Sequence, residues 1–394
     1  MILKKEFEYN TDEELACYKL ANMTGVGNKS IFSLLKCTGS AIEVLKLPEQ
    51  SIYEILNKRS ANAFLQQKDK VQELTLEKLK NKENLKFIPY LSPEYPNRLR
   101  NIANPPFSLY VKGQLPKEHI PSVAIIGARA CSEYGKNVAS LFGKRLGAAG
   151  IQVISGMARG IDGIAQRGAI EGGGQTYAVL GCGADVCYPP ENISLYKDIP
   201  QCGGIISEYP NGTKAQSGLF PERNRIISGL ADLLLVIEAR KRSGTYITVT
   251  QALEQGKDVY VVPGRITDSL SDGCNFLLTQ GAGVATCPEM IIDAVGGCGD
   301  SFKRCGTSGL ECKLPYNENN QNTGDSMQNN GMDKMEKIIL SYLDTTPISM
   351  EELFICIQDV ISTDLASLQL ELIKLQIKGY VVGEGNYYCR RSTL

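Results

Sequence analysis

Two glycine turns, each carrying an arginine, stand out in the middle of the sequence. Gly127 and Arg129 follow one short apolar run, and Gly156 and Arg159 follow the next. Glycine lets the backbone approach a ligand closely, and a helix that begins after such a turn offers free N–H groups to an anion. Guanidinium groups add charge-assisted contacts to phosphate oxygens. These residue types at this spacing predict a phosphate-binding site.

A third segment places cations at the expected start of a helix. It reads Phe220-Pro-Glu-Arg-Asn-Arg-Ile-Ile-Ser-Gly, and Pro221 suits the first helical position. Arg223, Asn224 and Arg225 would then lie in the first turn, where cations oppose the helix dipole at a cost of about 0.3–1 kcal/mol. A bound anion would remove that cost, so these cations indicate an anion-binding site at the start of the helix. The alternative is an ordinary ion pair between one of these arginines and Glu222 or Asp232.

A fourth segment, Arg240-Lys-Arg-Ser-Gly-Thr, follows an apolar run and precedes a helix expected near Thr245. Ser243, Gly244 and Thr245 are suited to an anion cradle beside the basic run. A charge run is usually only a solvated face. Its position after a strand, like that of the first two turns, favours a functional role.

The candidate DNA- or phosphate-binding residues therefore come from four turns that are distant along the chain. They are Gly127, Arg129, Ser155, Gly156, Arg159, Gly160, Arg223, Asn224, Arg225, Arg240, Ser243, Gly244 and Thr245. Asp162 also follows the second turn, but a carboxylate suits the first turn of a helix, where it offsets the dipole and accepts free N–H groups. We therefore predict a structural role for Asp162.

The elements that would position these turns alternate between strand and helix over residues 122–295. Apolar runs typical of buried parallel strands are followed by helical patterns, which predicts an α/β fold with a Rossmann-like parallel sheet. The predicted strands are Val123–Ile126, Ile151–Ile154, Tyr177–Leu180, Gly204–Ser207, Leu233–Ile237 and Val259–Val262. Because ligands bind beyond the carboxyl ends of parallel strands, the four turns are expected at one edge of the sheet.

Several functional classes find no support in the sequence. The first turn lacks the G-x-G-x-x-G pattern and acidic residue of a dinucleotide site, and the P-loop pattern is absent. The single histidine, His119, has no plausible nucleophile beside it. Cys298, Cys305 and Cys312 lack the spacing of a zinc site. We predict no cofactor, no metal and no enzymatic activity.

Composition bounds the class of protein. The formal net charge is −1, so a nucleic-acid site must be a local cluster. The first residues lack the apolar core of a signal peptide, and no apolar run approaches the roughly 20 residues of a membrane helix. The 13 cysteines are scattered without close pairs, which is typical of a reducing compartment. A cytoplasmic protein without a membrane partner is expected.

Four regions are predicted along the chain. Residues 1–82 read as a small helical domain, in which a glycine turn resembles a SAM or helix–hairpin–helix fold. The Rossmann-like domain takes residues 83–295. Residues 296–333, rich in Asn, Gly and Ser, read as a flexible linker. Residues 334–394 show three helical patterns and a hairpin, which predicts a winged helix.

Four motifs in order, Ile-Gly-Ala-Arg, Ser-Gly-Met-Ala-Arg-Gly-Ile-Asp, Phe-Pro-Glu-Arg-Asn-Arg-Ile-Ile-Ser-Gly and Ser-Gly-Thr, resemble those of the DNA-processing protein A family, also called Smf. The resemblance implies a cytosolic protein that binds single-stranded DNA and helps to load the RecA recombinase during natural transformation. It further implies a homodimer formed through the Rossmann-like domain, and partnership with single-strand binding protein.

Two other functions remain open from the residues alone. One is a nucleotide-processing enzyme of the phosphoribohydrolase type, whose P-G-G-x-G-T turn is only partly echoed by Lys241-Arg-Ser-Gly-Thr. The other is a transcription regulator acting through the winged helix. The third helix of that module carries few basic residues, so a protein-contact or accessory role fits it better than DNA reading.

Overall fold

The computed structural model describes residues 9–73, 85–296, 333–343, 348–357, 364–384 and 387–390. It divides into two compact units, Met1–Gly299 and Asp300–Leu394. The predicted linker and its three cysteines lie outside the described residues, apart from its two ends. Among the described helices, none is both long and apolar enough to cross a bilayer.

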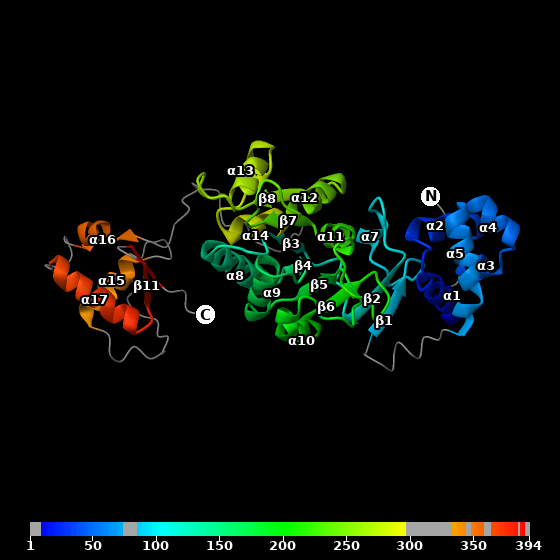
Figure 1. Ribbon diagram of the computed structural model, residues 1–394, viewed down its shortest axis with the longest axis horizontal. Coiled ribbons are helices and arrows are strands. Elements are labelled where there is room, and N and C mark those ends of the chain that lie inside the picture. The colour runs from blue at the N-terminus through cyan, green and yellow to red at the C-terminus, as the bar shows by residue number, and fades with distance from the viewer. Residues whose placement is uncertain are drawn as a thin grey trace. The chain divides into compact units, whose positions relative to one another are not determined.

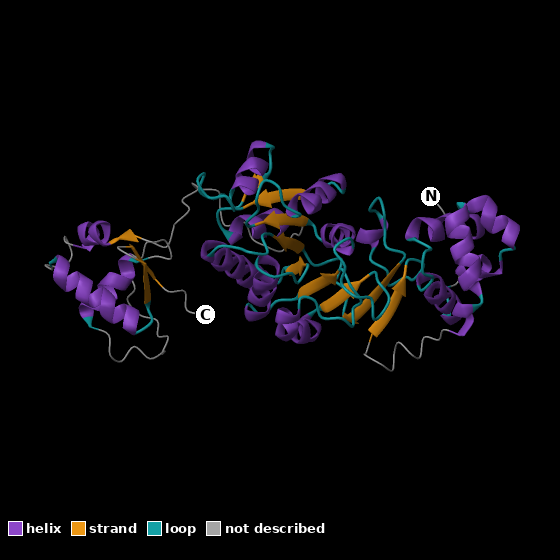
Figure 2. Cartoon of the chain, viewed as in Figure 1, coloured by secondary structure: helices purple, strands orange, loops and turns teal. Residues whose placement is uncertain are grey.

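The larger unit is built on a nine-stranded sheet with the order β1-β2-β6-β5-β4-β3-β7-β8-β9 (Figures 1 and 2). All pairs from β6 to β9 are parallel, as the sequence predicts for a Rossmann-like fold. The parallel strands are β3 (Ser122–Ile126), β4 (Gln152–Ser155), β5 (Thr176–Leu180), β6 (Gly204–Ser207), β7 (Leu233–Val236), β8 (Asp258–Val261) and β9 (Gly283–Val284). Each of the six predicted strands ends within one residue of its predicted bounds.

The chain changes direction at β3. It builds β4, β5 and β6 on one side of that strand and then crosses to lay down β7, β8 and β9 on the other. In open α/β sheets ligands bind beyond the carboxyl ends of the strands near such a reversal. The topology therefore puts the predicted site beside the turn that follows β3.

Helices cover both faces of the sheet. On one face α8 (Glu133–Ala148), α9 (Ile161–Glu171) and α14 (Pro288–Gly296) share an apolar core with alternate residues of the central strands, such as Val123 and Ile125. On the other face α11 (Leu219–Leu230), α12 (Thr245–Glu254) and α13 (Asp272–Thr279) pack on the intervening residues, such as Ala124 and Ile126. Burial on both faces explains why these strands are continuous apolar runs.

Two antiparallel strands extend the sheet at one edge. β1 (Leu85–Pro89) pairs with β2 (Ser108–Gly113), which pairs antiparallel with β6. The short helix α7 (Asn97–Arg100) lies in the proline-rich segment between them. Two short strand-like runs around a proline-rich middle predict both strands and the break between them. They do not predict that the strands join the parallel sheet, because pairing partners leave no local pattern.

The N-terminal helices form part of the same compact unit. They are α1 (Thr11–Ala21), α2 (Asn28–Thr38), α3 (Ala41–Lys46), α4 (Glu49–Ile55), α5 (Lys58–Lys68) and the 3₁₀ turn η1 (Lys70–Glu73). Their core runs on into β1, β2 and α10 (Ile193–Cys202), and the Asn22 amide donates to the Tyr110 hydroxyl at 3.1 Å. Asn10 caps α1, since its side chain accepts a bond from the Glu13 amide.

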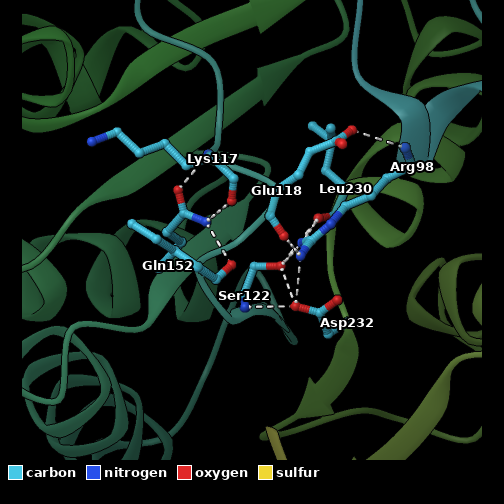
Figure 3. A network of polar contacts seen from close by, with 8 residues as sticks. Arg98, Lys117, Glu118, Ser122, Gln152, Leu230 and Asp232 are labelled. Carbon is cyan, nitrogen blue, oxygen red and sulfur yellow. Dashed lines mark hydrogen bonds and ion pairs between the residues drawn. The ribbon is translucent and has the colours of Figure 1, made fainter. Parts of the chain in front are cut away.

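A polar network closes the amino edge of the sheet (Figure 3). Asp232 accepts bonds from the Ser122 amide at 2.9 Å and hydroxyl at 3.0 Å, and Arg98 lies 3.1 Å from it. Glu118 accepts bonds from the Asn97 side chain and from the Asn97 and Arg98 backbone. The network ties α7 to the starts of β3 and β7, opposite the carboxyl edge where the predicted turns lie.

The smaller unit contains α15 (Lys334–Tyr342), β10 (Ile348–Ser349), α16 (Met350–Ile357), α17 (Leu365–Ile377), β11 (Val381–Glu384) and β12 (Tyr387–Arg390). Its three strands pair antiparallel in the order β10-β12-β11. Asp364 caps α17, since its side chain accepts a bond from the Ser367 amide at 2.7 Å. The winged helix itself stays a prediction, supported by three helices followed by a hairpin.

Candidate functional site

A pocket opens at the carboxyl edge of the sheet, between the turns after β3, β4 and β5 and the first turns of α11. The residues that line it come from the turns after β3 and β4, from the end of β5 and the loop that follows it, and from α11. They are Arg129, Gly156, Ala158, Arg159, Leu180, Gly181, Cys182, Tyr188, Pro189, Phe220 and Arg223. Four of the predicted residues, Arg129, Gly156, Arg159 and Arg223, therefore come together in one place.

The first two turns are pressed against each other, and their glycines make this possible. A Cβ on Gly127 would lie 2.7 Å from the Ile161 side chain at the start of α9. Gly160 has a φ of +72°, and a Cβ there would clash with the carbonyl oxygens of Ala128 and Arg129. The Ile161 amide donates to the Ala128 carbonyl at 3.2 Å. Gly127 and Gly160 thus serve turn packing, which brings the two arginine-bearing turns side by side.

Gly156 forms the floor of the pocket. Its amide donates to Asp162 Oδ2 at 3.1 Å, and its carbonyl accepts from Arg223 Nη1 at 3.0 Å. A Cβ at this position would lie 2.7 Å from the Arg223 guanidinium and 2.8 Å from Asp162. The next residue, Met157, has a φ of 51°, a region that non-glycine residues rarely adopt. Such local strain at a pocket is typical of binding sites.

Asp162 is buried and has the structural role predicted for it, since it accepts the Gly156 amide. Burial raises the pKa of its carboxyl group, and the charge of Arg223 and the hydrogen bonds from the turn oppose that rise. The carboxylate therefore stabilises the second turn and partly neutralises the charge of Arg223.

Arg223 is almost fully buried, 4% exposed, and holds the ends of two strands. Besides Gly156 it donates to the carbonyl of Val179 in β5, and its Nε donates to the Asn224 side chain at 3.2 Å. Burial lowers the pKa of the guanidinium to about 10. The charge of Asp162 opposes this lowering, and the charge of Arg129 adds to it. Arg223 stays charged at neutral pH but has few donors left for a ligand.

Aromatic rings and guanidinium groups face one another across the pocket. The guanidinium carbons of Arg129 and Arg223 lie 5.4 and 5.9 Å from the centre of the Phe220 ring. The Tyr188 ring lies 5.4 Å from that of Phe220 at an angle of 32°. Arg129 is exposed and forms no ion pair with any described residue. Its charge is available to an anion.

Arg159 lies at the rim of the pocket. Its guanidinium pairs with Glu191 at 2.5 Å, and both side chains are more than half exposed. The hydrogen bond to Glu191 raises the pKa of Arg159. Exposed pairs of this kind contribute little to stability, because water screens the two charges. A phosphate can therefore replace Glu191 at little cost.

Arg225 does not reach the pocket. Its guanidinium forms two bonds with the carboxylate of Glu208, at 3.0 and 2.7 Å, and both side chains are buried. The helix α11 begins at Leu219, two residues before the predicted Pro221, so Arg225 lies in its second turn, and its Nη1 also donates to the Glu222 carbonyl at 3.0 Å. The ion pair left open by the sequence is formed, with Glu208 rather than Glu222 or Asp232.

Ser155 and Asn224 have local partners. The Ser155 hydroxyl is buried and donates to the Ile125 carbonyl at 2.6 Å, so it ties β4 to β3. The Asn224 side chain accepts from Arg223. Both support the pocket from behind rather than lining it.

The turn after β7 carries Arg240, Ser243, Gly244 and Thr245, at the same sheet edge as the pocket but not in its lining. Arg240 is exposed, and α12 begins at Thr245 as predicted. The Ser243 hydroxyl is buried without a hydrogen-bond partner. The sequence-based site is thus split into the pocket and a neighbouring basic turn.

Sequence reasoning missed part of the lining. Gly181 and Cys182 follow β5 and line the pocket. The Gly181-Cys-Gly sequence could have predicted them, because it is a third glycine turn after a strand. Tyr188 and Phe220 are aromatic residues near the turns, but periodicity gave no means of separating exposed rings from core. Burial raises the pKa of the Cys182 thiol to about 11, so this thiol is poorly suited to nucleophilic chemistry.

The pocket and fold can be compared with known proteins. The family model for DNA recombination-mediator protein A matches residues 86–296, which is more than half of the chain. The chain belongs to this family. The DNA processing protein DprA of Streptococcus pneumoniae is 36% identical over 282 residues, covering 70% of this chain and 95% of that protein. The protein Smf of Escherichia coli is 40% identical over 211 residues, covering 53% of this chain and 56% of that protein.

A solved structure agrees with the fold of the larger unit. The X-ray structure of DprA from Streptococcus pneumoniae covers 73% of this chain and 99% of its own, with a TM-score of 0.65 and 33% identity. The family assignment made from the four motifs is therefore confirmed, and so is the Rossmann-like α/β fold. Within the part of the chain that the structure describes, no group of three or more His, Cys, Asp or Glu residues is arranged to hold a metal ion.

Proposed function

We propose that this protein binds single-stranded DNA in the pocket at the carboxyl edge of its sheet, and that it acts on DNA as a recombination mediator without catalysing a reaction. The observation that carries the proposal is the convergence of Arg129 and Arg159, from two turns, and Arg223, from α11, onto a pocket lined by Phe220 and Tyr188. Cations suit the phosphates and aromatic faces suit the bases of an unpaired strand.

The roles within the pocket differ. Arg129 and Arg159 are exposed and would neutralise phosphates, whereas the buried Arg223 would hold the two strand ends and Gly156 in place. Phe220 and Tyr188 offer ring faces to a base, each such stack being worth roughly 1–3 kcal/mol. Duplex DNA has no unstacked bases to offer, so the preference for single strands follows from the aromatic part of the pocket.

Membership of the family supports the wider role. We propose that the protein protects incoming single strands during natural transformation, helps to load RecA on them, and works beside single-strand binding protein in the cytoplasm. We also propose a homodimer formed through the Rossmann-like domain. The winged-helix module of the smaller unit would serve an accessory or protein-contact role.

The test is a comparison of charge reversals with equal change in net charge. Arg129→Glu/Arg159→Glu should abolish binding of a labelled oligothymidylate, measured by fluorescence anisotropy. The control is Lys144→Glu/Arg145→Glu at the opposite edge of the sheet. It is closely matched because Arg145 also forms an exposed pair, with Glu289 at 2.6 Å. Equal affinity of the two variants would refute the pocket as the site.

Two further comparisons separate the alternatives. A nucleotide-processing enzyme should bind a nucleoside monophosphate as tightly as an oligonucleotide, with little dependence on salt. The proposed function predicts that affinity falls by about 0.7 log units per log unit of salt for each phosphate contacted. Deleting residues 334–394 should leave binding intact, whereas a winged-helix regulator would lose it.

A further inference from the structure

Four neighbouring strands each end in a turn that carries an exposed arginine. The strands are β4, β3, β7 and β8, which are adjacent and parallel in that order. Their turns carry Arg159, Arg129, Arg240 with Arg242, and Arg265. Because parallel strands end at the same edge, these five side chains form a row across the sheet. We call it the arginine row.

The row extends the pocket in one direction. Arg129 belongs to both, and the turns after β3 and β7 are in contact, since the Ser132 amide donates to Glu238 at 3.0 Å. Beyond that point Arg240, Arg242 and Arg265 form no ion pair with any residue that the structure describes. Unpaired cations in a line repel one another. This repulsion is unfavourable unless anions lie beside them.

The other direction along the edge is less suited to a polyanion. The turn after β5 carries Asp185, and β6 is followed by the buried pair of Glu208 and Arg225. One exposed cation, Lys214, lies in the longer loop that follows. The segment after β8 also carries Asp268 and Asp272, but the cations on that side outnumber them. These cations are Arg240, Lys241, Arg242 and Arg265, whereas toward β5 the single carboxylate of Asp185 is matched by the single cation Lys214.

Aromatic side chains accompany the row. Tyr134, in the first turn of α8, is 47% exposed and donates to the Pro263 carbonyl at 3.4 Å, beside Arg265. Lys241 lies 4.9 Å from the centre of the partly exposed Phe276 ring. Alternation of cations and exposed rings is typical of surfaces that bind unpaired strands.

We propose that the arginine row is a second part of the DNA-binding surface, over which a single strand runs from the pocket across β3, β7 and β8, at right angles to the strands. This inference rests on the proposed function and adds the path and direction of the strand. The pocket alone holds a short segment, and each phosphate beyond it pairs with Arg240, Arg242 or Arg265. Long strands should bind more tightly than short ones because of these residues.

The test compares two lengths of oligothymidylate, about 4 and about 20 nucleotides, a span chosen to bracket ordinary single-strand site sizes. Arg240→Glu/Arg242→Glu should weaken binding of the long strand more than tenfold and that of the short strand less than threefold. For this variant and the long strand, the slope of log affinity against log salt should become shallower by about 1.4. This is about 0.7 for each lost phosphate contact. Lys144→Glu/Arg145→Glu is the matched control.

The direction of the path is tested by two single changes. Arg265→Glu should weaken long-strand binding, and Lys214→Glu should not. The reverse result would mean that the strand leaves over β5 and β6, and would overturn the inference. Melting temperature measured for each variant excludes loss of the fold as the cause.

Failure of this inference and failure of the proposed function give different results. If Arg129→Glu/Arg159→Glu loses both strand lengths while Arg240→Glu/Arg242→Glu binds the long strand as tightly as the unchanged protein, the pocket stands and the row does not. If the pocket variant binds both lengths normally, the proposed function itself is refuted.

Discussion

The guanidinium of Arg129 lies over the ring of Phe220, 5.4 Å from its centre, although one residue follows β3 and the other opens α11. The contact joins two halves of the chain at the point where strand order reverses. It holds the charged group against a flat apolar surface, where a cation–π interaction is worth about 0.5–1 kcal/mol at an exposed site. Arg129 and Phe220 can thus contact a phosphate and a base of one strand in the same pocket.

Replacing Phe220 by leucine should weaken single-stranded DNA binding by roughly 5- to 150-fold, because a stacking surface worth about 1–3 kcal/mol is lost. The salt dependence should change little, since the cations remain. Fluorescence anisotropy at several salt concentrations measures both. Tyr53→Leu, at an exposed aromatic of α4, is the control. An unchanged affinity for Phe220→Leu would show that bases do not stack on this ring.

Gly156→Ala should damage the pocket although it adds a single methyl group. The new Cβ would lie 2.7 Å from the Arg223 guanidinium and 2.8 Å from Asp162, both held by hydrogen bonds. Overpacking of this kind costs about 1–3 kcal/mol, so both the free energy of unfolding and DNA affinity should fall. Gly218→Ala meets nothing within 4 Å and serves as the control. Equal behaviour of the two variants would contradict the tight packing.

Arg225 should matter for stability rather than for phosphate contacts. Glu208→Gln leaves the Arg225 charge buried without its partner, which costs about 3–5 kcal/mol, and urea unfolding measures the loss. Glu289→Gln, which breaks the exposed pair with Arg145, should cost less than about 1 kcal/mol. Arg225→Gln/Glu208→Gln, which removes both buried charges together, should leave the salt dependence of DNA binding unchanged. A drop of about 0.7 would instead return Arg225 to the site.

The strands of the fold could be predicted from the sequence because each central strand is buried on both faces and so appears as an apolar run. Val123–Ile126 and Gly204–Ser207 were placed within a residue on that basis. The antiparallel addition of β1 and β2 could not be predicted, since pairing depends on contacts distant in sequence. The shared core of the N-terminal helices and the sheet likewise left no local signal.

The arginines of the site were predicted from type and spacing, but their individual roles were not. The sequence predicts both Arg223 and Arg225 as site residues, and the structure places Arg223 at the pocket and Arg225 against Glu208. The two are separated by one residue, so they project from α11 about 200° apart. Which of them faces the pocket depends on the rotation of that helix, fixed by packing that spacing does not reveal.

Glu118 offers a test of the network at the amino edge of the sheet. Burial opposes its ionisation slightly, but hydrogen bonds from Asn97 and Arg98 hold the pKa of its carboxyl group below the ordinary value. A lowered pKa in the folded state means that the contribution to stability is present above the unfolded value of about 4.3 and is lost as pH falls through the folded value.

Glu118→Gln should therefore lower the free energy of unfolding at pH 7, by less than about 1 kcal/mol because the group is exposed, and should make little difference near pH 2. Urea unfolding at both pH values gives the comparison. Glu54→Gln, at an exposed glutamate of α4, is the control. A difference between Glu118→Gln and the unchanged protein that persists at pH 2 would mean that the side chain acts there by packing and not by its charge.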